Sequence, residues 1–147
     1  AIAALLSGIT LGNAGLGAAH GFAAPVGANF PVLHGVVCAA LLPHVIHANV
    51  NALRAQSNEH PTLGRYAVIG RTLTGQNAAG DAVAIEAAVD FVASLTRQLA
   101  IPRLSSYGLS EADIVPMVEL AKKASSMRYN PAKLSDESLA AILREAI

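Results

Sequence analysis

Charge is missing from the first third of this sequence. No Asp, Glu, Lys or Arg occurs before Arg54, and all ten acidic and ten basic residues lie from that position onward. Soluble domains intersperse charge over their exposed surface, so we expect the stretch from Ala1 to Leu53 to be covered by another domain or chain. The formal net charge is zero. Because nucleic acid and anionic membranes attract basic surfaces, we expect neither as a partner.

Cysteine, tryptophan and a recognisable signal segment are also scarce or absent. Tryptophan does not occur, and the single cysteine, Cys38, has no partner for an internal disulfide. No charged region followed by a cleavage site opens the chain, so we expect a cytoplasmic protein. Because the chain begins with Ala1 instead of Met, we expect it to be the C-terminal part of a longer polypeptide. Its 147 residues, 53% of them hydrophobic, suit one domain, 1–147, with a full-sized core.

The apolar stretch is interrupted too often to predict a membrane span. Glycine, proline, asparagine and histidine punctuate it, and no basic cluster or aromatic belt flanks it. Its glycine-rich segment, LGNAGLGAAHG, matches neither GxGxxG nor GxxxxGK[ST], and no predicted strand precedes it. We therefore expect these small residues to serve close helix packing. The sequence also contains no GxSxG, HExxH or CxxC motif.

The remaining pattern is helical throughout, because no long stretch alternates apolar and polar residues with period two. We predict an all-α bundle of about six or seven helices and no strands. The first helices are expected at 1–10, 13–24, 35–55, 62–73 and 81–99, with a connector at 25–33. Proline removes a backbone donor and clashes with the preceding turn, so Pro43 is expected to bend or break the helix at 35–55.

Helix caps predict the two last helices. Ser110 followed by Asp113 has the spacing of a capping box, and the helix that it opens should bury Ile114, Met117, Val118 and Ala121. Ser135 is expected to cap a final helix, whose first turn carries two acidic residues where the helix dipole favours negative charge.

Histidines are the candidate metal ligands. His20 and His34 lie on either side of a Gly/Pro-rich bend, and neutral imidazole is a common ligand of transition metals. Spacing alone favours a structural role for each of them, and two histidines are too few for a stable centre. Such a centre takes three or four protein ligands, often including a carboxylate. Further ligands would have to come from another segment.

The other nucleophilic and ligating side chains are expected to be structural. His44 and His47 stand one helical turn apart, and a structural or solvent-facing role is favoured for both over metal binding. His60 is expected to be a solvated loop residue. Cys38 has apolar neighbours and no basic residue to lower its thiol pKa, which favours a packed, inert thiol.

The segment from Asn13 to Val45 resembles the signature region of the iron-containing alcohol dehydrogenases. The resemblance comprises GLG-x-x-HG at Gly15–Gly21, P-x-G at Pro25–Gly27 and HG-x-x-x-A-x-LLP at His34–Pro43. Later segments, including YGLSEADI and SMRYNP, resemble the family's C-terminal half in the same order. The resemblance therefore covers essentially the whole chain.

The resemblance implies the metal-binding helical domain of a two-domain enzyme with the dehydroquinate synthase-like fold. In that family an N-terminal α/β domain binds NAD or NADP, and one Asp and three His hold a divalent metal in the interdomain cleft. The resemblance places two of these histidines on His20 and His34, and the other two ligands before Ala1. Many members carry a further histidine near the nicotinamide where this chain has Ala24.

The implied activity is metal-dependent alcohol dehydrogenase or aldehyde reductase activity on a small alcohol or aldehyde. The implied metal is Fe²⁺, with Zn²⁺ as in the related glycerol dehydrogenases as an alternative. The partner would be the N-terminal nucleotide-binding domain of the same protein, and a homodimer is possible. The 147-residue piece alone is expected to be inactive. The alternative from a different class is a non-catalytic helical interaction module that docks a partner through its uncharged face.

Overall fold

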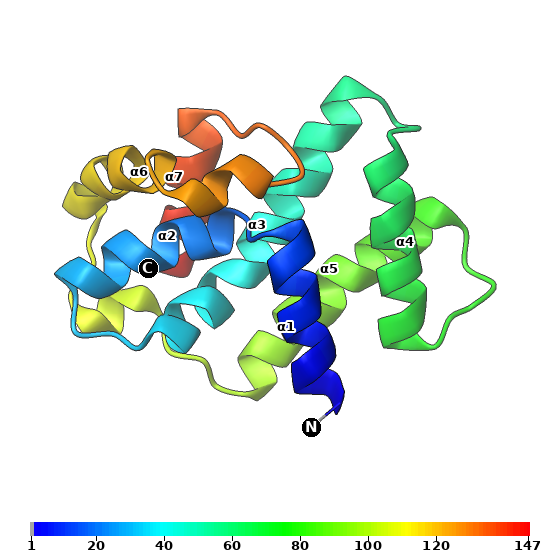
Figure 1. Ribbon diagram of the computed structural model, residues 1–147, viewed down its shortest axis with the longest axis horizontal. Coiled ribbons are helices and arrows are strands. Elements are labelled where there is room, and N and C mark those ends of the chain that lie inside the picture. Colours follow the sequence, from blue (N-terminus) through cyan, green and yellow to red (C-terminus); the bar gives the residue numbers. More distant parts are fainter. Residues whose placement is uncertain (1) are drawn as a thin grey trace.

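The computed structural model describes residues 2–147, which fold into helices without a strand in that range (Figure 1). The predicted all-α class and the helix count are confirmed. The helices are α1 (Ile2–Ala14), α2 (Ala18–Asn29), α3 (His34–Gln56), α4 (Pro61–Thr74), α5 (Asp81–Gln98), α6 (Ile114–Lys122) and α7 (Asp136–Ala146). Short 3₁₀ helices η1 (Leu104–Tyr107), η2 (Glu111–Asp113) and η3 (Ser125–Tyr129) connect the later ones.

The helix α3 is the central element of the fold. Its first half shares a core with α2, α6 and α7 that includes the fully buried Phe22, Leu41 and Leu143. In this core α3 packs on α2 and α7, and α6 packs on the same two helices. Its second half packs with α4 and α5 around a smaller core that includes Leu53 and Ala67. Figure 1 shows α4 on the right and α6 and α7 on the left, with α5 running from beside α4 toward the centre of the molecule.

Two prolines lie inside helices, although Pro25 was expected to begin a connector and Pro43 to bend or break its helix. Pro25 lies within α2, so the predicted connector at 25–33 is wrong up to Asn29, and α3 runs unbroken past Pro43. A helix-interior proline costs about 3 kcal/mol. Burial of apolar side chains offsets that cost. Val26, the residue after Pro25, is fully buried in the core, and Pro43 itself is buried.

The first break in the helices falls at Gly15–Gly17 and not before Asn13 as predicted. Gly15 adopts a φ of 71°, in the left-handed region that glycine occupies without strain. A Cβ on Gly15 would lie 2.5 Å from Cγ of Tyr129, and a Cβ on Gly17 would lie 3.0 Å from Oδ1 of Asn130. The packing role predicted for these glycines is therefore confirmed at the junction of α1 and α2.

The helix α1 leaves the body of the bundle with an apolar surface. Its residues are all exposed, although its sequence carries no charge. The long helix α3 would satisfy the length and composition of a membrane span. Its buried residues, however, contact helices on several sides, which is the environment of the central helix of a bundle.

The predicted caps are present. The Ser110 backbone N–H donates to Oδ2 of Asp113 at 2.9 Å, and the Ser135 hydroxyl accepts from the backbone N–H of Ser138 at 3.2 Å. The expectation of a solvated His60 is wrong, because its Nδ1 accepts from the backbone N–H of Thr62 at 3.2 Å and so caps α4.

Candidate metal centre

The start of α2 is held in place by a side chain from the far end of the chain. The amide oxygen of Asn130 accepts from the backbone N–H of Ala18 at 3.0 Å, two residues before His20. The amide nitrogen of Asn130 donates to Oδ1 of Asn49 on α3 at 2.6 Å. Asn49 is the buried polar residue of the described chain, with 2% exposure. Asn130 therefore links the start of α2, which carries His20, to the second half of α3.

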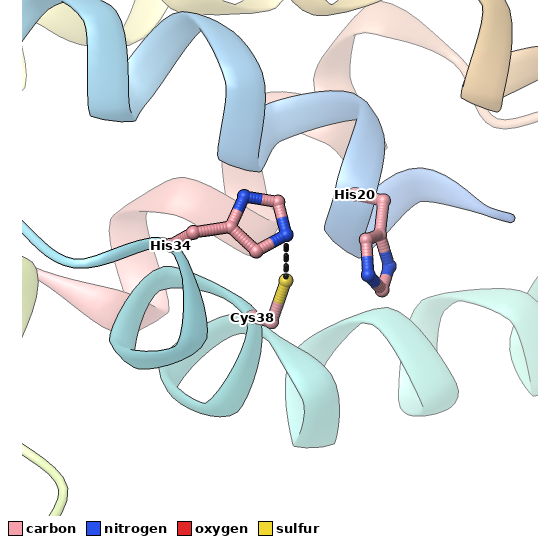
Figure 2. Close-up of side chains that lie close together, drawn as sticks. All are labelled: His20, His34 and Cys38. Carbon is pink, nitrogen blue, oxygen red and sulfur yellow. Dashed lines mark hydrogen bonds between the residues drawn. The ribbon is translucent and has the colours of Figure 1, made fainter. Parts of the chain in front are cut away.

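Three potential ligands from α2 and α3 come together in space (Figure 2). The ligating atoms of His20, His34 and Cys38 all lie within 4.8 Å of one another. The ring centroids of His20 and His34 are 5.3 Å apart with an angle of 53° between the ring planes. Nε2 of His34 lies 3.6 Å from Sγ of Cys38. We call these residues the His20–His34–Cys38 cluster.

Helix geometry explains how the cluster forms. His34 is the first residue of α3 and Cys38 follows one turn later, and residues at i and i+4 share a helix face. His20 reaches the same space from the beginning of α2, which packs against α3. Each side chain keeps some access to solvent: His34 is exposed, and His20 and Cys38 are partly buried. An ion could therefore enter the cluster without a rearrangement of the core.

The environment favours the neutral forms of two members of the cluster, His20 and Cys38. Partial burial lowers the pKa of His20 below its usual value, and the neighbouring His34 lowers it further. Burial raises the pKa of the Cys38 thiol. Neutral imidazole nitrogens and a thiol that can lose its proton are donors for divalent transition metals, with thiolate the softer of the two. The donor set thus fits a divalent transition metal.

Cys38 was missed by the sequence analysis, which assigned it an inert, packed role. The spacing of four between His34 and Cys38 was the available signal, because it places both side chains on one face of a helix. That signal was obscured by the apolar neighbours of Cys38. Within residues 2–147, the cluster includes no carboxylate.

The other sequence candidates lie outside the cluster. Ala24 is exposed on α2, one turn beyond His20 on the same helix. His44 and His47 lie about 15 and 20 Å further along α3 than His34, where they line a cavity of about 430 Å³ with Glu145. Within residues 2–147, the ligating atoms of these three side chains are not close enough together to share one ion.

His44 has a shifted pKa that is unrelated to the cluster. Burial lowers the pKa of its imidazole, and the positive charge of Arg103 and the neighbouring His47 lower it further. The carboxylate of Glu145 acts in the opposite direction without cancelling the shift. His44 is therefore a neutral side chain of the bundle near neutral pH.

Comparison with known proteins identifies the family of this chain. The model of the Fe-containing alcohol dehydrogenase family, C-terminal, matches residues 1–147. The 1,3-propanediol dehydrogenase of Klebsiella pneumoniae is 34% identical over 99% of this chain and 36% of its own length. The lactaldehyde reductase of Escherichia coli is 31% identical over the same shares. A crystal structure of a 1,3-propanediol oxidoreductase superposes with a TM-score of 0.81 at 32% identity, over 97% of this chain and 36% of that one.

The chain belongs to the Fe-containing alcohol dehydrogenase family and corresponds to its C-terminal domain. The resemblance deduced from the signature motifs is thereby confirmed. The chain spans about a third of the length of the curated relatives it matches, 36% in both.

Proposed function

We propose that this chain is the metal-binding domain of a NAD(P)-dependent alcohol dehydrogenase that interconverts a small alcohol and the corresponding aldehyde. The reaction removes a hydride and a proton from the alcohol, and the hydride passes to the oxidised nicotinamide. The observation that carries the proposal is the convergence of His20 and His34 from separate helices, with ring centroids 5.3 Å apart. Two neutral imidazoles in that arrangement fit a shared divalent cation.

In this proposal His20 and His34 each donate one ring nitrogen to the metal, Fe²⁺ or Zn²⁺. A divalent cation bound there supplies Lewis acidity toward the oxygen of an alcohol or carbonyl. The described chain contributes no carboxylate to the cluster, so the remaining protein ligands come from a nucleotide-binding domain of the same protein. Ala24, exposed one turn after His20, would face the nicotinamide and would leave space there, because it contributes only a methyl group.

The nucleotide-binding domain would also cover the apolar surface of α1. The large apolar side chains of this helix are between 48% and 75% exposed, and they are Ile2, Leu5, Leu6, Ile9 and Leu11. Exposed apolar surface of that kind is characteristic of an interface. The same surface favours the second candidate, a non-catalytic interaction module. In either case we expect the 147-residue chain alone to be inactive, because the nicotinamide cofactor would be bound mainly by the nucleotide-binding domain.

Metal analysis of the natural polypeptide, combined with an activity assay, tests the proposal. The purified protein should contain a transition metal in near-stoichiometric amount and should reduce NAD⁺ or NADP⁺ in the presence of a small alcohol. His20→Ala and His34→Ala should each lose metal and activity together. His47→Ala is the matched control, because His47 is an exposed histidine on the same helix α3. This variant should keep both the metal and the activity.

Two results would contradict the proposal. A natural polypeptide that folds without metal and shows no alcohol-dependent reduction would favour the interaction module. Full metal content in both His20→Ala and His34→Ala would place the metal elsewhere, even if the enzyme were active.

A further inference from the structure

We propose that Cys38 is a further protein ligand of the metal, binding through Sγ beside His20 and His34. The inference rests on the proposed function, because it concerns the same metal. It adds an anionic sulfur donor to the imidazoles of the centre. Because sulfur is a soft donor, a centre with Cys38 should bind a borderline-soft metal such as Zn²⁺ more tightly than a centre with the two histidines alone.

The first support is the distance between the two donors on α3. At bond lengths of about 2.05 Å to nitrogen and about 2.3 Å to sulfur, tetrahedral geometry separates N and S by about 3.6 Å. The structure places Nε2 of His34 and Sγ of Cys38 3.6 Å apart. One ion can therefore contact both atoms without movement of the helix that carries them.

The second support is the position of His20. Its ligating atom lies within 4.8 Å of both other donors and comes from a different helix. Figure 2 shows the three side chains turned toward one another across the space between α2 and α3. His20 is partly buried, so rotation about its side-chain bonds could shorten the remaining distance. The three side chains would then hold one ion together.

The third support is the chemistry of the donors. Cysteine sulfur and histidine nitrogen are both common ligands of Zn²⁺, and within residues 2–147 these three side chains are the group of ligating atoms that lies close enough together to share one ion. The opposing interpretation is a simple thiol–imidazole hydrogen bond between Cys38 and His34, which needs no metal. The experiment below separates the two.

Cobalt substitution of the natural polypeptide reports on the sulfur directly. Thiolate bound to Co²⁺ gives an intense near-ultraviolet charge-transfer band, whereas histidine ligands give only the weaker visible bands. We expect this band in the Co²⁺ protein and its loss in Cys38→Ser and Cys38→Ala. X-ray absorption of the Zn²⁺ protein should show a sulfur neighbour at about 2.3 Å. Replacing a residue that only hydrogen-bonds to a metal ligand already costs about 10–100-fold in metal affinity, so Cys38→Ser should weaken Zn²⁺ binding at least about tenfold.

Controls distinguish failure of this inference from failure of the proposed function. His47→Ala should retain the band, because the exposed His47 lies outside the cluster. One outcome overturns the role of Cys38 and leaves the histidine site intact. In that outcome the unaltered protein binds Co²⁺ without a sulfur band, and His34→Ala loses the visible bands. Absence of Co²⁺ binding, or binding that survives both His20→Ala and His34→Ala, overturns both proposals. Circular dichroism of Cys38→Ser and Cys38→Ala confirms that the variants are folded before their spectra are compared.

Discussion

Asn130 offers the sharpest test of how the fold positions the candidate ligands. Its side chain accepts from the backbone N–H of Ala18 at 3.0 Å and exchanges hydrogen bonds with Asn49 at 2.6 and 3.3 Å. Asn130→Ala would leave the Ala18 N–H and the Asn49 amide without these partners. Both belong to buried residues, and an unsatisfied buried polar group costs about 1–3 kcal/mol. The expected loss for two such residues is about 2–6 kcal/mol, a large share of the typical stability of a domain.

Urea unfolding of the natural polypeptide, followed by circular dichroism, measures this loss. Asn51→Ala is the matched control, because Asn51 is an exposed asparagine on α3 and its replacement should change stability by less than about 0.5 kcal/mol. The double variant Asn49→Ala/Asn130→Ala should cost less than the sum of the single variants, because removing both partners leaves fewer unsatisfied groups. A loss below about 1 kcal/mol for Asn130→Ala, or strictly additive effects, would refute the reasoning.

Two further predictions concern the bundle. A Cβ on Gly70 would overlap the carbonyl of Ala84 where α4 meets α5, so Gly70→Ala should destabilise by about 1–3 kcal/mol or more in thermal or urea unfolding. Gly64→Ala on the same helix meets no atom within 4 Å and should stabilise by about 0.5–1 kcal/mol; equal effects would contradict the packing described. The lowered pKa of His44 means that the unfolded chain binds a proton that the folded chain does not. Stability should therefore fall as pH drops below about 6.5, and His44→Gln should reduce that fall; an unchanged slope from about pH 8 to pH 5 would contradict it.

The sequence was a good guide where structure is set locally. The cap at Ser135 depends on neighbours within one turn, and the predicted hydrogen bond to Ser138 is present. The position of the break between α1 and α2 could not be predicted from neighbouring residues in the sequence. Its position depends on the ring of Tyr129, which packs over Gly15 from the other end of the chain. Long-range packing of this kind leaves no periodic signal.

The candidate site likewise combines a local sequence signal with contacts that depend on long-range packing. Spacing alone could have joined His34 to Cys38, because four residues are one turn of a helix. It could not have brought His20 to them, since that approach depends on how α2 packs against α3. The family signature supplied His20 and His34 through resemblance, and the structure added Cys38, whose apolar neighbours in sequence had suggested an inert side chain.

The short sequence distance between the ligands has a consequence for folding. A metal shared by His20 and His34 ties together two points separated by a loop of about 15 residues, and in the chain-entropy model a cross-link of that length contributes about 3 kcal/mol. The ion would thus restrict the unfolded chain as a disulfide does, in a protein whose single cysteine has no partner. The α2–α3 pair would then be held by a reversible cross-link that forms only when the metal is bound.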